Sequence, residues 1–344
     1  MNPYALSIIV SSLALGTITT VSSHHWMLAW VGLEINTMAI IPLMTKTPHP
    51  RAIEAATKYF LTQAVASAMI LFSSATNAWM TGEWDITQYS NNISTTLLSI
   101  ALAMKLGIAP FHFWLPDVLQ GLTLQTGLIL STWQKLAPMV LLIQIHASTN
   151  LNLMLTMGLV SMIVGGWGGI NQTQTRKILA FSSIAHLGWM VVVLKLSPQL
   201  TLLNFSLYLL LTSTLFLTFL HLNTKSIFEI STSWSKASTL TSLSLLLLLS
   251  LSGLPPLTGF LPKWLIAQEM IKQHLTLLAT AILLTTLLSL FFYLRLAYNM
   301  ALTLAPNTST SSPSWQTTPK NFLSMFIILS LLLLPPTPTI LLFT

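Results

Sequence analysis

Four side chains that carry a charge at neutral pH interrupt apolar stretches of the sequence: Glu34, Lys105, Lys135 and Lys263. Each charged group at the centre of a bilayer costs roughly 2.5–3.5 kcal/mol, so a structural role alone gives no reason to retain four of them. A buried lysine suits proton transfer, because desolvation opposes its charge while a nearby carboxylate stabilises it. The four residues therefore predict a proton path through a membrane.

Glu34 is the only carboxylate in this set. We expect it to pair with Lys105 and to hold that ammonium protonated until the pair separates. Lys135 lies between Lys105 and Lys263 in sequence order and is predicted to bridge them. A lysine can instead extend to the membrane interface and keep its charge in water, and the sequence leaves this alternative open for Lys135 and Lys263.

Two histidines are secondary candidates for the same path. His112 lies in an apolar segment rich in proline and aromatic residues, and His186 lies in the middle of another apolar stretch. Histidine titrates near neutral pH, as a proton relay requires. A buried histidine that only forms a hydrogen bond to a neighbouring helix fits each position equally well.

Residues 107–116 and 253–262 share the pattern Gly-x-x-Pro-x-x-x-x-Leu-Pro. A proline inside a helix removes a backbone hydrogen bond and kinks or breaks the helix, which lipid-exposed backbone cannot tolerate. We therefore predict broken helices near 105–117 and 252–264. The prolines that cause the breaks are Pro110, Pro116, Pro256 and Pro262.

The two broken helices are the fourth and ninth of the predicted spans, so they cross the membrane in opposite directions. Paired broken helices of opposite direction are typical of inverted repeats, in which they mark a transport path near the membrane midplane. The alternative is that the motifs are two unrelated proline kinks, which are common in membrane helices.

The elements that must hold these residues are membrane spans. Only 6% of the 344 residues are charged, against about 25% in soluble domains, and the mean hydropathy is +0.75. A span needs about 20 mostly apolar residues. By that measure the chain is one all-α transmembrane domain over 1–344 with about eleven helices, near 3–22, 25–45, 59–80, 94–115, 118–145, 151–170, 174–196, 200–222, 239–262, 275–299 and 321–342.

Basic residues predict the orientation of these spans, because they concentrate on the side that is not translocated. Connections after even-numbered spans, including the predicted loops Thr45–Lys58 and Asn223–Ser238, hold most of them: Lys46, Arg51, Lys58, Arg176, Lys177, Lys225, Lys236 and Lys320. The N-terminus is therefore predicted on the positive-inside face. An odd number of spans places the C-terminus on the opposite face.

Composition excludes several other classes of protein. The formal net charge is +7, but the basic residues form no patch that could follow a nucleic acid backbone. The chain has no cysteine, so disulfides, iron–sulfur ligation and cysteine zinc sites are excluded. The glycine-rich run Gly165–Gly169 follows no strand and indicates helix packing rather than a nucleotide-binding loop.

Glu34, Lys105, the run from Gly107 to Asp117, Lys135 and the run from Leu254 to Lys263 together resemble the antiporter-like subunits of respiratory complex I. The resemblance extends over nearly the whole chain. It implies two inverted five-helix repeats that carry a Glu–Lys pair (Glu34 and Lys105), a central lysine (Lys135) and a terminal lysine (Lys263), with His112 in the first repeated motif.

The same resemblance implies a core membrane-arm subunit of proton-pumping NADH:ubiquinone oxidoreductase that has no cofactor of its own. NADH, FMN, iron–sulfur clusters and ubiquinone would bind to other subunits of the respiratory chain complex. Expected partners are neighbouring antiporter-like subunits, accessory subunits and lipids such as cardiolipin. The implied location is the mitochondrial inner membrane, with the N-terminus in the matrix and the C-terminus in the intermembrane space.

Two other functions are compatible with the same residues. A secondary monovalent cation/proton antiporter would use the same lysines and repeats. A structural scaffold subunit could keep the fold without pumping. Purification together with NADH dehydrogenase activity distinguishes the complex I subunit from the antiporter, and pumping after loss of Glu34, Lys105 and Lys135 identifies the scaffold.

Overall fold

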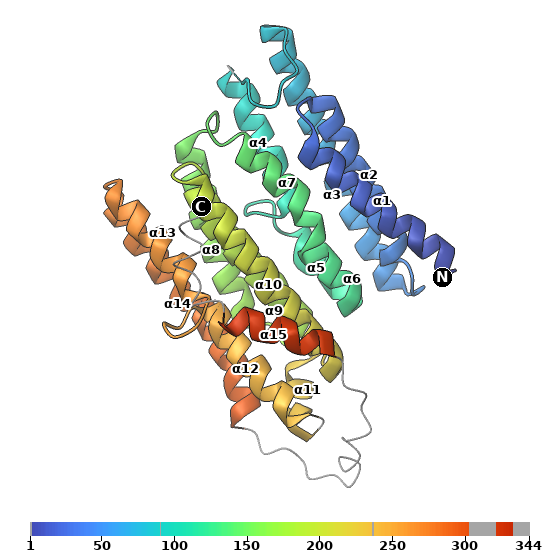
Figure 1. The fold of residues 1–344 in the computed structure, drawn as a ribbon, viewed down its shortest axis with the longest axis vertical. Coiled ribbons are helices and arrows are strands. Elements are labelled where there is room, and N and C mark those ends of the chain that lie inside the picture. The colour runs from blue at the N-terminus through green and yellow to red at the C-terminus, as the bar shows by residue number, and fades with distance from the viewer. Residues whose placement is uncertain (1, 90, 236, 303–320, 333–344) are drawn as a thin grey trace. The chain divides into compact units, whose positions relative to one another are not determined.

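A computed structural model describes residues 2–89, 91–235, 237–302 and 321–332, and the regular elements in those ranges are helices (Figure 1). This confirms the all-α class. In the described part, eight helices are long and apolar enough to cross a membrane. The chain divides into two compact units, Met1–Ser161 and Met162–Thr344, which are described separately below.

The N-terminal unit is built from seven consecutive helices and the first half of an eighth. Their bounds are α1 (Pro3–Ser22), α2 (Trp26–Met44), α3 (Pro50–Thr81), α4 (Asn92–Leu106), α5 (Trp114–Gly121), α6 (Leu124–Ser131), α7 (Trp133–Gln144) and α8 (Leu151–Ile170). Side chains satisfy backbone N–H groups that the helix starts leave free. Asn2, His25, His49, Asn91 and Thr123 accept these hydrogen bonds.

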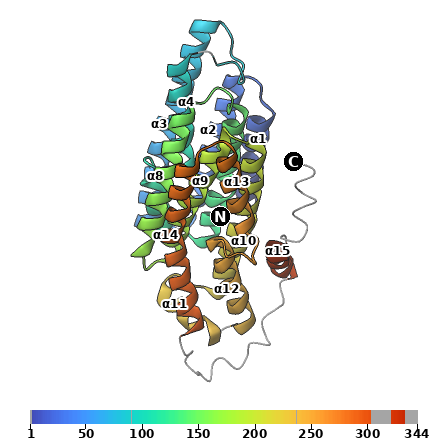
Figure 2. The same ribbon diagram turned by 90° about the vertical axis from the view of Figure 1, so that its left-hand side faces the viewer.

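Small residues let α1 and α2 pack closely. A Cβ added to Gly16 would lie 2.5 Å from Asn36 Oδ1, and one added to Gly32 would lie 2.5 Å from Thr19 Oγ1. Close approach through glycine is a common way for membrane helices to associate. The longest helix, α3, packs against both α4 and α5, and both views show α3 and α4 side by side (Figures 1 and 2).

The C-terminal unit contains the remaining helices. Their bounds are α9 (Thr175–Leu194), α10 (Pro198–Leu222), α11 (Ile227–Ser231), η1 (Thr232–Ser235), α12 (Ser238–Ser252), α13 (Phe260–Lys272), α14 (Thr276–Ala301) and α15 (Asn321–Leu332). Within this unit α10 packs against α9, α12 and α15, and α12 packs against α14. Thr258 Oγ1 donates a hydrogen bond of 2.8 Å to Ser330 O and so joins α15 to the segment before α13.

One predicted loop is shorter in the structure. The segment Thr45–Lys58 was predicted as a connection, but α3 already begins at Pro50. His49 accepts a hydrogen bond of 3.2 Å from Arg51 N–H, and a proline at the first helical position sacrifices only an N–H that has no helical partner. Lys58 therefore lies on a helix and not in a loop.

The fifth predicted span, 118–145, is not one helix. It contains the end of α5, the short α6, and α7, because the chain changes direction after Gly121 and again at Thr132. The loop predicted over Asn223–Ser238 contains α11 and η1. Lys236, Lys320 and residues 333–342 of the last predicted span lie outside the described residues.

Candidate functional site

Each unit contains an interrupted helix at its proline motif. In the N-terminal unit α4 ends at Leu106 and α5 begins at Trp114, and in the C-terminal unit α12 ends at Ser252 and α13 begins at Phe260. Gly107 and Gly253 follow the first halves with φ of 76° and 86°. Glycine adopts this left-handed conformation without the steric penalty that a Cβ brings.

The two interruptions share several backbone hydrogen bonds. Gly107 N–H and Ile108 N–H both donate to Ala103 O, and Phe111 N–H donates to Ile108 O. The second motif repeats this pattern at Leu254 and Leu257, which donate to Leu249 O and Leu254 O. The repeated sequence thus forms these hydrogen bonds in both interruptions, whereas the peptide bond before the first proline is cis only at Ala109–Pro110.

The prolines occupy positions where they are tolerated. Pro110 and Pro256 lie inside the interruptions, where no helical hydrogen bond is required of them. Pro116 and Pro262 lie in the first turns of α5 and α13, where the N–H of an ordinary residue would have no helical acceptor.

In the N-terminal unit, Lys105 and Lys135 line the same buried cavity. Lys105 is in the last turn of α4 and Lys135 in the first turn of α7, and their exposed fractions are 6% and 3%. Tyr59 and Gln63 on α3 also line this cavity, which gives about 20 Å³ to the centres of water molecules. That is room for roughly one water. The packing thus brings two predicted site residues together at a polar cavity.

Glu34 lies next to this cavity, on α2. Its Oε2 atom accepts a hydrogen bond of 3.1 Å from Thr37 Oγ1, and Thr37 lines the cavity. Lys105 Nζ has no hydrogen-bond partner among the described residues. The two residues of the expected Glu34–Lys105 pair therefore lie at or next to the same cavity without a hydrogen bond between them.

Two amide side chains of the cavity have polar atoms without a partner in the described part of the chain. Both amide atoms of Asn36 and the Nε2 atom of Gln63 are buried and form no hydrogen bond. The exposed fractions of these residues are 2% and 4%. Buried polar atoms of this kind are normally satisfied by ordered water, so the cavity chemistry favours a bound water between the lysines.

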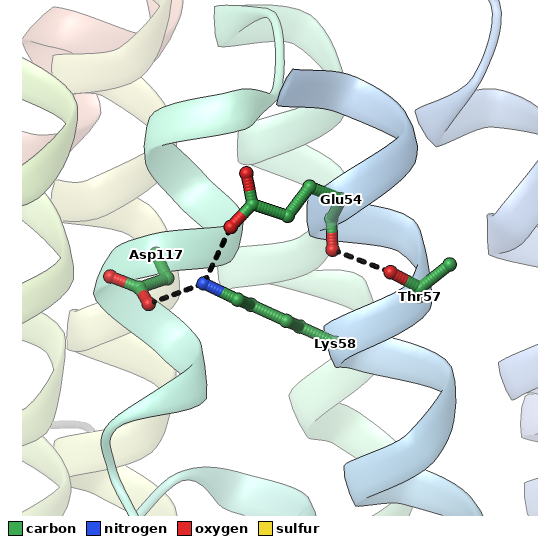
Figure 3. Close-up of polar contacts among 4 residues, drawn as sticks. All are labelled: Glu54, Thr57, Lys58 and Asp117. Atoms are coloured by element: carbon green, nitrogen blue, oxygen red, sulfur yellow. Dashed lines mark hydrogen bonds and ion pairs between the residues drawn. The ribbon is translucent and has the colours of Figure 1, made fainter. Parts of the chain in front are cut away.

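A charged cluster at the start of α3 connects this helix to α5. Lys58 Nζ lies 2.8 Å from Glu54 Oε1 and 3.0 Å from Asp117 Oδ2, as Figure 3 shows. Thr57 Oγ1 donates to Glu54 O in the same turn. The cluster holds the second half of the interrupted helix against α3.

In the C-terminal unit, Lys263 binds the end of the first half-helix. Its Nζ atom donates a hydrogen bond of 2.7 Å to Ser252 O, the last residue of α12. The carbonyls at a helix C-terminus carry partial negative charge and favour a cation there. The lysine side chain therefore joins the two halves of the interrupted helix.

His186 and Lys263 line a second cavity, together with Asn204 and Tyr208. It gives about 10 Å³ to water centres, close to the smallest space that holds one water. His186 Nε2 lies 3.4 Å from Tyr293 Oη. The two residues that sequence reasoning assigned to this half of the chain are thus placed at one polar cavity.

His112 lies in the first interruption, and its exposed fraction is 7%. Its ring centre is 4.3 Å from that of Phe113, and its Nδ1 atom has no hydrogen-bond partner among the described residues. His112 does not line the cavity of Lys105 and Lys135. Among the described residues, no group of three or more His, Cys, Asp or Glu side chains could hold a metal ion.

Sequence reasoning did not assign Asn36, Gln63, Lys58 or Asp117 to a site. The amides of Asn36 and Gln63 are uncharged polar groups within α2 and α3, and the sequence alone does not show that they face a cavity. Lys58 was assigned to a loop, although His49 and Pro50 are a signal for a helix start before it.

Comparison with known proteins identifies the family. Residues 23–289 match the family model described as NADH:quinone oxidoreductase/Mrp antiporter, and residues 290–341 match that of the NADH dehydrogenase subunit 2 C-terminus. NADH-ubiquinone oxidoreductase chain 2 of Aquarana catesbeiana is 60% identical over 344 residues, which are 99% of this chain and 100% of the relative. Chain 2 of Salmo salar is 60% identical and covers 99% and 98%.

Solved structures agree with this result. A chain of respiratory complex I from Thermus thermophilus with bound aureothin superposes with a TM-score of 0.85 at 27% identity, covering 98% of this chain and 80% of that chain. A chain of the Mrp complex of Dietzia sp. shares the fold, with a TM-score of 0.78 at 18% identity over 87% of this chain and 61% of that chain. The resemblance predicted from the motifs is confirmed: the chain belongs to the antiporter-like membrane subunits of respiratory complex I, in the family of NADH-ubiquinone oxidoreductase chain 2.

Proposed function

We propose that this membrane-arm subunit carries protons along Glu34, Lys105, Lys135 and Lys263 while other subunits transfer electrons from NADH to ubiquinone. The observation that supports this most is the common cavity of Lys105 and Lys135, since two buried lysines line one water-sized cavity and burying each charge costs free energy. Electron transfer drives the path through electrostatic coupling along the membrane arm.

The chemistry at the cavity is a proton exchange between two amines. An N–H bond of the Lys105 ammonium breaks, a water in the cavity relays the proton, and an N–H bond forms on a neutral Lys135. Glu34 stabilises the charge on Lys105 until the two move apart. Transport against each 100 mV costs about 2.3 kcal/mol per proton, so one change in the environment of Lys105 has to supply a free energy of this order.

The proposed topology is a single transmembrane domain over 1–344 with eleven spans and two inverted repeats. Eight helices of sufficient length and two interrupted spans (α4–α5 and α12–α13) support ten of these spans, and the eleventh is proposed from the apolar sequence 321–342. The identical hydrogen bonds at Gly107 and Gly253 support the repeat. The basic residues favour the matrix side of the mitochondrial inner membrane for the N-terminus, and the intermembrane space for the C-terminus.

The proposed partners are neighbouring antiporter-like subunits and accessory subunits of the complex, and lipids such as cardiolipin around the membrane spans. NADH, FMN, iron–sulfur clusters and ubiquinone are assigned to other subunits. The exposed large apolar side chains of α1, α3 and α14 provide a surface for lipid or for neighbouring helices.

The test replaces the buried lysine and compares it with an exposed one. In the assembled complex, we expect Lys135→Met to lower the number of protons translocated per pair of electrons. Lys46→Met, at an exposed position after α2, serves as the control and should leave this number unchanged. An unchanged number in Lys135→Met, with normal assembly, contradicts the proposal.

The same preparation distinguishes the two other functions. Cation/proton exchange by this chain purified without NADH dehydrogenase activity would identify an antiporter. Normal pumping after simultaneous loss of Glu34, Lys105 and Lys135 would identify a scaffold.

A further inference from the structure

Asp117 and Lys263 occupy the same position in the two copies of the repeated motif. Each follows the Leu-Pro pair of its motif, Leu115–Pro116 or Leu261–Pro262. Each lies in the first turn of the second half-helix, α5 or α13. The C-terminal unit thus has a cation of the proposed path at a position where the N-terminal unit has an acid with no assigned role.

Asp117 lies at the edge of an open, charged cavity. The cavity gives about 180 Å³ to water centres and is lined by Arg51, Glu54, Lys58, Asp117 and Gln120, among others. The side chains of Lys58 and Asp117 are 43% and 49% exposed. Water therefore reaches the Asp117 carboxylate. The charged groups of α3 that line the same cavity are Arg51, Glu54 and Lys58, and Figure 3 shows Glu54 and Lys58 beside Asp117.

This open cavity and the cavity of Lys105 and Lys135 follow one another along the contact between α3 and α5. On α3, Lys58 lines the open cavity, and Tyr59 and Gln63 line the buried one. From Lys58 to Gln63 the helix rises about 7–8 Å. Along the sequence of α5 the buried cavity comes first, since Trp114 lines the buried cavity and Asp117 the open one. Because α3 and α5 are antiparallel, the two opposite sequence orders correspond to one order of the cavities in space.

An aromatic pair lines the buried cavity at the contact between α3 and α5. The rings of Tyr59 and Trp114 are 5.6 Å apart and meet edge to face. Trp114 Nε1 also donates a hydrogen bond of 3.1 Å to Met104 O, next to Lys105. Any movement of α5 away from α3 separates these rings. It also changes the hydrogen bond from Trp114 to Met104 at the end of α4.

We propose that Asp117 is the proton-entry group of the N-terminal unit, and that the Tyr59–Trp114 pair controls passage from Asp117 to Lys105. The inference rests on the proposed function. A hydrated proton in the open cavity gives its proton to the Asp117 carboxylate, forming an O–H bond. The neutral acid no longer forms an ion pair with Lys58, which keeps its contact with Glu54. When the Tyr59 and Trp114 rings part, the O–H bond of Asp117 breaks and its carboxylate is restored, water relays the proton past the rings, and an N–H bond forms on a neutral Lys105.

Two matched substitutions separate a proton-carrying role from a structural one. Asp117→Asn and Lys58→Met remove the same ion pair, and an exposed pair of this kind contributes little to stability. Only Asp117→Asn removes the group that binds the proton. In the assembled complex we expect Asp117→Asn to lower the number of protons translocated per pair of electrons as much as Lys135→Met does. Asp117→Glu should restore this number, and Lys58→Met should leave it unchanged.

Equal losses in Asp117→Asn and Lys58→Met would overturn the proposal in favour of a structural ion pair. Normal pumping in Asp117→Asn would overturn it as well. If Lys135→Met lowers the proton number while Asp117→Asn does not, only the entry site is wrong. If neither variant lowers it, the proposed function itself fails.

Access from water is tested without reference to pumping. Because the chain has no cysteine, Gln120→Cys places the only thiol of this chain at the open cavity, and Gln63→Cys places it at the buried one. We expect a membrane-impermeant thiosulfonate to modify Gln120→Cys from the side on which α3 begins. Gln63→Cys should become reactive only when Tyr59→Ala is added. Protection of Gln120→Cys, or modification of Gln63→Cys with Tyr59 intact, would contradict the proposed order.

Discussion

Gly253 provides a direct test of whether the position of Lys263 matters to the proton path. Gly253 has a φ of 86°, and an added Cβ would lie 2.8 Å from Lys263 Nζ. Gly253→Ala therefore introduces two effects at once. It strains the backbone, and it displaces the ammonium from the carbonyl of Ser252, with which the ammonium forms a hydrogen bond of 2.7 Å.

The magnitudes of the two effects can be separated. A non-glycine residue in the left-handed conformation costs about 1–2 kcal/mol, and a hydrogen bond to a charged group contributes about 1.5–3 kcal/mol. We expect Gly253→Ala to destabilise the chain by about 2.5–5 kcal/mol. Gly82→Ala is the matched control, because Gly82 has a φ of 79° and no atom within 4 Å of an added Cβ. Only the backbone cost, about 1–2 kcal/mol, should remain there.

The assay compares both variants in the purified complex. Thermal inactivation of NADH:ubiquinone activity reports stability, and protons translocated per pair of electrons report the path. We expect a lower inactivation temperature in both variants, with the larger decrease in Gly253→Ala, and a lower proton number in Gly253→Ala alone. Equal effects of the two substitutions on both measurements would refute the reasoning, because the contact with Lys263 would then have no consequence.

Two further substitutions test the packing and hydration of the N-terminal unit. Asn36→Leu replaces a buried amide whose two polar atoms form no hydrogen bond. It should lower the number of protons translocated by displacing water from the cavity of Lys105 and Lys135, and it should leave thermal stability intact. An unchanged number would show that Asn36 holds no relay water. Gly32→Val, where a Cβ already meets Thr19 Oγ1 at 2.5 Å, should separate α1 from α2 at a cost of about 1–3 kcal/mol. Quantification of assembled complex on native gels checks this, with Leu15→Val on the exposed side of α1 as the control that should assemble normally.

The helix interruptions could be predicted because their causes are local. Glycine permits the left-handed conformation and proline excludes a helical hydrogen bond in almost any surroundings. The structure accordingly has its interruptions at Gly107–Phe113 and Gly253–Gly259. The family resemblance depends on these two motifs together with Glu34, Lys105 and Lys135.

The site itself could be predicted only in part, because it depends on contacts between distant segments. Their charge within apolar stretches identified Lys105 and Lys135. Nothing in their spacing requires that they line one cavity, because the cavity results from how α3, α4 and α7 pack. The same limit applies to Glu34, whose hydrogen bond goes to Thr37 within its own helix. Lys58 was assigned to the wrong element because a histidine cap is an uncommon start signal compared with Ser, Thr, Asp or Asn.

The repeated motif also suggests how one backbone can serve two opposite steps of transport. A carboxylate near water attracts a proton, and an ammonium held at a helix C-terminus repels one. Asp117 and Lys263 occupy equivalent positions in α5 and α13 but differ in the sign of their charge. In the proposed path the first unit therefore favours uptake at its interrupted helix and the second favours release. This difference in charge stands on two motifs that share the backbone hydrogen bonds of Ile108 and Phe111 in the first and of Leu254 and Leu257 in the second.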